Sequence, residues 1–334
     1  MYSDEELASA VAAGVLTEEA ATAFRNHVAQ ERTMPAVDEE HFRLLTGFND
    51  IFVVIACALL LVSVTWIGGA VTSSFGLVLQ AATAWGLAEY FTLKRRMSLP
   101  SIVLLLVFVA GVFATGLDLL SNSGLSADLA KGIPSAVAAV AAWLHWKRFK
   151  VPVTVAAGTA TLAASSIFLL VGFVPEIRPF ILPLVFFAGI AVFFLAMRWD
   201  SSDTKRQTGR SDVAFWLHLL AAPMIVHPVF SLLMSGESNV GIFQAAMVIS
   251  LYIVIALVSI SIDRRALMVS ALAYVLYAIN TILEMYGVVS LGFAFTAFAI
   301  GSGLLLLSAF WHVCRKAVLV HYPEHIREHL PALR

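Results

Sequence analysis

Two histidines and two prolines interrupt the apolar stretch FWLHLLAAPMIVHPVF at residues 215–230. An imidazole can bind, release or pass on a proton near neutral pH. Within a helix, Pro223 and Pro228 each remove a backbone donor and disturb the carbonyl four residues earlier, which predicts a kink or a break. His218 lies nine positions before His227, so a straight helix turns the two side chains to opposite faces. His227 is therefore the first candidate for a proton-responsive or substrate-binding group.

Three more histidines, His321, His325 and His329, recur every four residues in the final segment HYPEHIREHLPALR. His325 and His329 could share a metal ion on one helix face, but His321 would lie roughly 12 Å from His329. Pro323 fits best in the first turn of a helix, which leaves His321 outside it. The segment also has the acidic and apolar sides of a helix at a membrane surface. An interfacial helix is the preferred interpretation, and a metal site and a histidine-based response to pH are the alternatives.

The composition indicates that these residues sit in a membrane protein. Of the 334 residues, 60% are hydrophobic and 13% are charged, whereas soluble domains have about 45–50% and about 25%. The apolar residues fall in blocks of about 20, the length that a helix needs to cross a hydrocarbon core of roughly 30 Å. Because lipid offers the backbone no hydrogen-bond partner, each block should be helical. We expect an all-α polytopic membrane protein surrounded by the lipid bilayer.

The apolar blocks predict about ten transmembrane helices in five hairpins. Their expected ranges are 50–69, 71–93, 99–120, 129–146, 151–173, 179–198, 212–234, 239–261, 266–286 and 289–313. Residues 1–48 would form a cytoplasmic helical hairpin and linker, residues 49–314 the ten-helix transmembrane domain, and residues 315–334 a cytoplasmic interfacial helical tail. An inverted repeat of two five-helix halves is permitted by this number, but the prolines of the two halves do not match.

The positions of the basic residues predict the orientation. In this arrangement only Lys131 and Arg178, of the 21 Lys and Arg residues, fall on the outer side. Cytoplasmic loops carry an excess of Lys and Arg, so both termini should be cytoplasmic. An odd number of helices would scatter the basic residues over both sides.

Other polar residues fall at depths similar to that of His227, which we estimate as about 20 Å from the cytoplasmic side. Asn280 reaches a similar height on the expected ninth helix, and Glu284 lies one turn above it on the same face. Asp118 is near the outer end of the third. Ionisable groups at mid-membrane depth are costly and are functional candidates by default. Together these residues predict an outward-facing polar cavity. The alternative is a kinked helix whose His227 bonds to a neighbouring helix, with Glu284 at the interface.

The N-terminal segment SDEELASAVAAGVLTEEAATAF, residues 3–24, predicts a small helical hairpin. Ser3 and Glu6 form a capping box, Gly14 stands where the first helix would end, and Thr17 opens the second. The apolar face between the two helices is small, so it does not predict that the hairpin folds alone. Residues 1–33 are therefore a candidate surface for a protein partner.

Both ends of the chain resemble those of a known group of proteins. The N-terminal hairpin sequence followed by apolar helices, with Trp311, Arg315, Pro323 and the pair Leu330-Pro331 near the end, is similar to a family of bacterial multi-pass inner-membrane proteins of unknown function. The resemblance implies a cytoplasmic hairpin ahead of many transmembrane helices, and a bacterial inner-membrane location. It implies no activity.

Several kinds of chemistry lack their sequence signals. The chain has no HExxH, GxSxG or GxxxxGK[ST] motif and no cofactor motif, so the ordinary enzyme classes are unsupported, and an intramembrane enzyme with an unfamiliar set of residues is the remaining enzyme alternative. A net charge of −1 argues against nucleic acid as a partner. Cys57 and Cys314 suit neither a disulfide framework nor a thiolate metal site, and we expect both to be apolar packing residues.

Two functional hypotheses follow from the sequence. In the first, the protein is a permease, or a ligand-binding membrane receptor, for a small solute or ion, with a broken seventh transmembrane helix at its centre. In the second, it is a non-transporting scaffold or accessory subunit that acts through its N-terminal hairpin. The broken helix with its mid-membrane histidine favours the first hypothesis, and the small number of intramembrane charges and the absence of a clear internal repeat favour the second.

Overall fold

The computed structural model describes residues 4–31, 48–204, 208–234, 242–265, 268–272, 274–276, 298, 301–303, 305–307, 310–327 and 330. Every regular element in these ranges is a helix. The all-α class that the sequence predicts is therefore confirmed for this part of the chain.

The N-terminal hairpin has the two helices that the sequence predicts. Helix α1 spans Asp4–Ala12 and helix α2 spans Glu18–Glu31. Gly14 takes φ +71°, a left-handed conformation that a glycine adopts without steric cost. Thr17 Oγ1 caps α2 by accepting a hydrogen bond of 3.1 Å from the backbone amide three residues later.

Eight long helical segments follow, at the positions of the first eight expected transmembrane helices. They are α3 (Phe48–Gly69), α4 (Ser73–Ala88) with the π-helix η1 (Glu89–Lys94), α5 (Ser98–Leu120), α6 (Leu129–Phe149), α7 (Val153–Phe173), the 3₁₀ helix η2 (Pro175–Phe180) with α8 (Ile181–Ser201), α9 (Gly209–Met234) and α10 (Ile242–Ile262). Five of these segments are long and apolar enough to cross a membrane: α3, α5, α7, η2 with α8, and α9. A helical membrane protein is the class that these five support.

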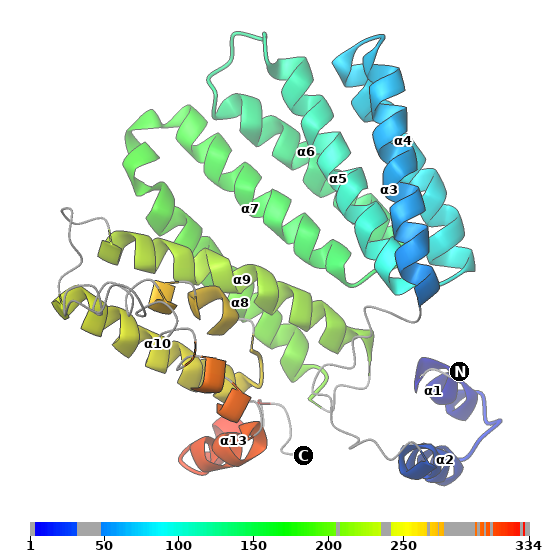
Figure 1. The fold of residues 1–334 in the computed structure, drawn as a ribbon, viewed down its shortest axis with the longest axis vertical. Coiled ribbons are helices and arrows are strands. Elements are labelled where there is room, and N and C mark those ends of the chain that lie inside the picture. Colours follow the sequence, from blue (N-terminus) through cyan, green and yellow to red (C-terminus); the bar gives the residue numbers. More distant parts are fainter. Residues whose placement is uncertain are drawn as a thin grey trace.

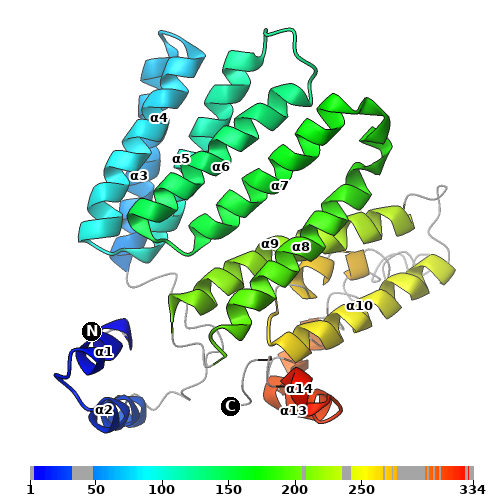
Figure 2. The same ribbon diagram turned by 180° about the vertical axis from the view of Figure 1, so that it is seen from behind.

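Consecutive helices pack as antiparallel neighbours, mainly α3 on α4, α4 on α5, α5 on α6, α6 on α7 and α8 on α9. Figures 1 and 2 show helices α3 to α7 side by side, with α8, α9 and α10 beyond α7. Helix α7 also contacts α9 and thereby joins the two groups. The turns after α4, α6 and α8 lie at one end of the helices, and the turns after α3, α5 and α7 lie at the other (Figure 1).

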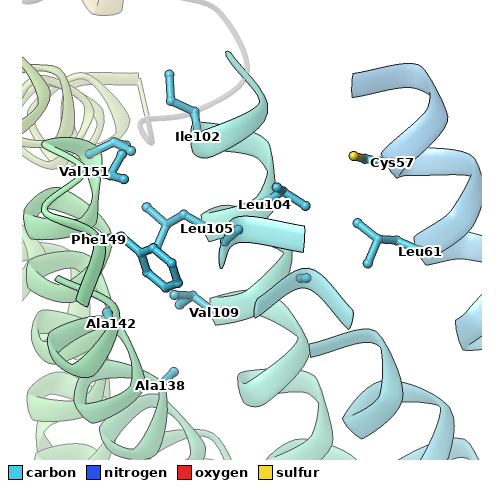
Figure 3. Packing of buried hydrophobic residues seen from close by; sticks show 13 residues of the cluster. Cys57, Leu61, Ile102, Leu104, Leu105, Val109, Ala138, Ala142, Phe149 and Val151 are labelled. Atoms are coloured by element: carbon cyan, nitrogen blue, oxygen red, sulfur yellow. The ribbon is translucent and has the colours of Figure 1, made fainter. Parts of the chain in front are cut away.

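The first group of helices packs around α5. Leu104 and Leu105 of α5 are fully buried, with Leu61 of α3 on one side and Ala142 and Phe149 of α6 on the other (Figure 3). Cys57 of α3 is also buried in this cluster, as expected for an apolar packing residue. Small residues on α6 let its backbone approach its neighbours closely, which is how membrane helices gain contact area.

Helix α9 is the most enclosed of the five apolar segments. Half of its apolar stretch is buried, compared with 17–28% in the other four. It is helical from Gly209 to Met234, through both Pro223 and Pro228. Neither proline ends the helix, so α9 is not broken, whereas the kink stays a prediction; neighbouring helices can satisfy the backbone groups that a proline frees.

The last part of the chain is described in short pieces. Residues 268–272 and 274–276 are helical and belong to the expected ninth transmembrane helix. Helix α13 spans Trp311–Leu319, and the short α14 spans Glu324–Arg327 directly after Pro323, which leaves His321 outside the helix as predicted. Most of the expected ninth and tenth transmembrane helices lie outside the described residues.

Candidate functional site

The side chain of His227 lies in a polar cluster on the C-terminal half of α9. Its Nδ1 is hydrogen-bonded to the hydroxyl of Tyr274 and lies 3.3 Å from Oγ of Ser231. The ring of Tyr274 stacks on Phe230, with centroids 4.7 Å apart and planes 24° apart. The stacking holds the phenol in place, and the rest of the His227 side chain is exposed at the surface of the helix bundle.

This cluster can exchange protons. An imidazole in contact with a phenol and a hydroxyl can be donor or acceptor at Nδ1, and its second nitrogen stays available to a ligand or to water. Tyr274 belongs to the expected ninth transmembrane helix, so His227 bonds to a neighbouring helix, which is the contact that the alternative to a polar cavity predicts. The sequence did not single out Tyr274, because a tyrosine in an apolar stretch has no signature that separates a hydrogen-bonding partner from a packing residue.

Asp118 lies elsewhere. It accepts a hydrogen bond from the hydroxyl of Ser74 in the first turn of α4, where the positive end of the helix dipole also favours a carboxylate. At this end of α5, helices α6 and α7 stand between α5 and α9 (Figures 1 and 2). The structure therefore does not bring Asp118 to His227, contrary to the expected cavity. Asn280 and Glu284 lie outside the described residues.

A second polar cluster, which the sequence did not reveal, holds the opposite end of α9. Asp200 of α8 accepts hydrogen bonds from Arg264, at 2.6 Å to Nη2 and 3.2 Å to Nε. His218 of α9 places Nε2 3.1 Å from the same carboxylate. All three side chains are at most 2% exposed. We call Asp200, His218 and Arg264 the buried triad.

The buried triad ties three helices together. Asp200 is at the end of α8, His218 is in the first half of α9, and Arg264 follows the end of α10. Arg264 Nη2 also donates to the carbonyl oxygen of Ser211 at 3.3 Å. An arginine fork suits such a site because its several donors can satisfy a carboxylate and a carbonyl together.

The ion pair of Asp263 and Arg315 extends this network to α13. Asp263, next to Arg264 in the sequence, accepts a hydrogen bond of 2.7 Å from the indole of Trp311 and lies 3.5 Å from Nη1 of Arg315. The guanidinium of Arg265 stacks over the Trp311 ring at 4.7 Å from its centroid. The loop after α10 is thereby fixed to α13 by charge and by aromatic contact.

The orientation rule explains why the triad escaped sequence reasoning. In the sequence, Arg264 is one more basic residue of a predicted cytoplasmic loop, a position that usually indicates exposure. Asp200 falls just beyond the expected sixth transmembrane helix, and nothing in the sequence pairs His218 with it. The available signal is the pair Asp263-Arg264 directly after an apolar helix, because charges that become buried there need partners.

The histidines of the C-terminal segment give no metal cluster within the part of the chain that the structure describes. His321 Nδ1 lies 2.9 Å from the carbonyl oxygen of Ala317 and so belongs to the end of α13. His325 is on α14, whose four residues begin with Glu324. His329 lies outside the described residues, so a site shared by His325 and His329 stays a prediction.

Comparison with known proteins identifies no relative: no family model, no curated protein and no solved structure matches the chain. The activity must therefore be inferred from the residues and their arrangement.

Proposed function

We propose that the protein is a multi-pass inner-membrane permease, or a ligand-binding membrane receptor built like one, for a small solute or ion, with α9 at its centre. The observation that carries this proposal is the polar cluster of His227, Tyr274 and Ser231 on the most enclosed apolar helix. An ionisable group at this depth is costly, so it is a functional candidate by default.

In this proposal His227 binds the solute or responds to protons, and Tyr274 sets the hydrogen-bonding state of its ring. Transporters commonly place such sites near the middle of the membrane, between helices that can move relative to each other. We propose that the site extends along the expected ninth transmembrane helix to Asn280 and Glu284, about 1.7 and about 2.8 helical turns beyond Tyr274. The buried triad holds the cytoplasmic ends of α8, α9 and α10 together below the site. A conformation closed on the cytoplasmic side is what such a clamp would stabilise.

The proposed location and orientation rest on the basic residues. Nearly all Lys and Arg are on the side of the turns after α4, α6 and α8, and a positive-inside arrangement puts that side and both termini in the cytoplasm. The polar cluster of His227 would then open toward the outer half of the membrane.

The test is the thermal stability of the full chain in lipid nanodiscs across a panel of metabolites and inorganic ions. A bound ligand raises apparent stability by mass action. We expect at least one compound to raise the Tm of the wild type, and to have a much weaker effect on His227→Ala and on Tyr274→Phe. The matched control is His321→Ala, which removes an exposed histidine outside the cluster and should leave the response unchanged. A panel without effect on the wild type would count against a solute site on α9.

A second candidate function is that of a scaffold or accessory subunit, and the N-terminal hairpin supports it. Leu7 and Ala21 are buried in the hairpin, whereas Val15 is 75% exposed and Phe24 is 44% exposed. Exposed apolar side chains on a small polar helix pair are typical of a contact surface. Deleting residues 1–33 should abolish recovery of the partner and leave the stability of the membrane helices unchanged; recovery of the same partner by the truncated chain would contradict a scaffold role for the hairpin.

A further inference from the structure

A cavity of about 250 Å³ lies at the helix ends that the basic residues assign to the cytoplasm, far along α9 from His227. It lies where the turn between η1 and α5 meets the turn between α6 and α7, and Trp216 of α9 closes one side. The polar side chains of its lining belong to Thr92, Arg96, Ser98, Ser101 and Lys150, together with the indole of Trp216. None of the lining residues is acidic.

The two cationic residues that line the cavity, Arg96 and Lys150, have an unusual backbone conformation. Arg96 has φ +51° and Lys150 has φ +56°, so each occupies the left-handed region, which a residue with a side chain rarely adopts. Lys150 ends α6 in this conformation, as the residues at helix C-termini commonly do, so the helix end fixes where its side chain begins. The nearby Arg148 is neutralised by Glu89, through hydrogen bonds of 2.9 and 2.8 Å. Within the described part of the chain, no carboxylate pairs with Arg96 or Lys150 in the same way.

Two helices also begin at this cavity. Helix α5 follows Met97 and helix α7 follows Pro152, and neither of these preceding residues caps its helix with a side-chain hydrogen bond. Both residues line the cavity, as do Ser98 and Val153, the first residues of the two helices. The first amides of a helix carry partial positive charge and can donate to an anion. Those at this cavity are the amides of Ser98 and Leu99 in α5 and of Val153 in α7, because Pro100 has no N–H and the Thr154 amide already donates to the carbonyl oxygen of Val151 at 3.0 Å.

The independent sign of a ligand is the hydroxyl of Thr92. Thr92 is 8% exposed, lines the cavity, and its Oγ1 has no hydrogen-bond partner among the residues that the structure describes. By contrast, the hydroxyls of Thr65 on α3 and Thr115 on α5 each donate a hydrogen bond to the backbone carbonyl oxygen four residues earlier. Thr92 lies in the π-helix η1, a rare geometry that is frequent at functional sites. A buried hydroxyl without a partner is costly, which favours a ligand there.

We propose that this cavity binds a phosphate group, between the first turns of α5 and α7, with Arg96 and Lys150 as its counter-charges and Thr92 as a hydrogen-bond donor. A volume of about 250 Å³ accommodates the phosphate with a small organic group attached. The phosphate comes either from a soluble phosphate compound in the cytoplasm or from the headgroup of an anionic lipid, since the cavity is at the expected membrane surface. The site is separate from the His227 cluster and does not depend on it.

The experiment uses the full chain in two kinds of nanodisc. In discs of phosphatidylcholine alone, inorganic phosphate is titrated and the Tm is followed; in a second set, phosphatidylglycerol is added to the discs without soluble phosphate. A rise in Tm with inorganic phosphate identifies a soluble source. A rise with phosphatidylglycerol alone identifies a lipid headgroup. Either result supports the proposal only if the rise in Tm is smaller in variants of the cavity residues.

The first variant is the double substitution Arg96→Asn and Lys150→Asn, because asparagine tolerates the left-handed conformation and removes the charge. We expect the apparent affinity for the stabilising phosphate to fall about tenfold or more, since each lost charge-assisted hydrogen bond is worth roughly that much. The control is Lys147→Gln, which removes a cation that lies 3.7 Å over the Trp143 ring and does not line the cavity. The control should bind phosphate as the wild type does.

The second variant, Thr92→Val, keeps the shape and removes the hydroxyl. Without ligand, it should unfold at the same or a higher temperature than the wild type, because it removes a buried polar group that has no partner. With ligand, its stabilisation should be weaker. The response to phosphate should also persist in His227→Ala, so that a failure of the site on α9 leaves this test intact. Absence of stabilisation by both phosphate sources, or equal stabilisation of the wild type and the double variant, would overturn the proposal.

Discussion

Asp200 is a carboxylate that folding removes almost completely from solvent, and it is stabilised there only by the partners that fold with it. Arg264, just after the end of α10, donates two hydrogen bonds to this carboxylate. His218 of α9 makes a third contact with it. A buried charge that loses its partner is far more costly than an exposed one, because nothing then compensates for its desolvation. The stability of the α8, α9 and α10 ends should therefore depend strongly on each member of the triad.

Replacing Asp200 by Ala leaves the guanidinium of Arg264 buried without its carboxylate. We expect the free energy of unfolding to fall by about 3–5 kcal/mol. The control is Glu89→Gln, which breaks the solvent-exposed pair with Arg148 and should lower the Tm much less. Both variants are measured by thermal unfolding in the same detergent or nanodisc. If the two lose the same amount of Tm, burial does not determine how much the triad contributes to stability.

At the scale of single residues, the sequence located His227 but not its partner. A mid-span histidine stands out from composition alone, whereas Tyr274 and Asp200 become significant only when other helices approach them. Asp118 was grouped with His227 by depth, and depth does not determine which helices are neighbours. Its bond to Ser74 follows from the contact between α4 and α5.

Helices α3 and α4 approach each other through two glycines. A Cβ added at Gly76 would lie 2.5 Å from the carbonyl oxygen of Thr65, and one added at Gly68 would lie 2.7 Å from the Cα of Gly76. The atoms that an added Cβ would meet are backbone atoms, so the overlap cannot be relieved by the movement of a side chain. Close approach of this kind is how helices gain packing energy in a membrane.

The substitution Gly76→Ala should force α3 and α4 apart and lower stability by about 1–3 kcal/mol. Gly86→Ala on the same helix is the matched control, because a Cβ there meets nothing within 4 Å. The control should be neutral or slightly stabilising, since alanine favours the helix over glycine. Unfolding of the two variants side by side decides the matter, and a Gly76→Ala protein as stable as the control contradicts the close packing of this hairpin.

At the scale of elements, apolar block length predicted the positions of the first eight long helical segments well, and five of them are long and apolar enough to cross a membrane. It could not predict the π-helix η1 at residues 89–94, since a change in hydrogen-bond register has no hydropathy signal. Two prolines in α9 predict a kink or a break. The helix continues through both, and it packs on α7, α8 and α10.

The orientation of the whole molecule is also testable. In the predicted orientation, one of the two outer basic residues, Arg178, forms an ion pair with Asp128, so its charge is compensated where it lies. Lys131 is the other, and the remaining Lys and Arg residues are the basis of the positive-inside prediction. We expect a reporter that is active only in the cytoplasm to work when it is fused to either end of the chain. Activity at one end alone would require an odd number of membrane helices.

Water access to His227 tests the central claim most directly. In a background with Cys57→Ala and Cys314→Ala, His227→Cys is treated in intact cells with a charged thiol reagent that does not cross membranes. The control is Val62→Cys, at comparable depth on α3, where the side chain is 56% exposed on an apolar helix and should face lipid. We predict rapid labelling at position 227 and none at position 62. Absence of labelling at both positions would mean that the exposed face of His227 meets lipid, and that α9 has no solute site there.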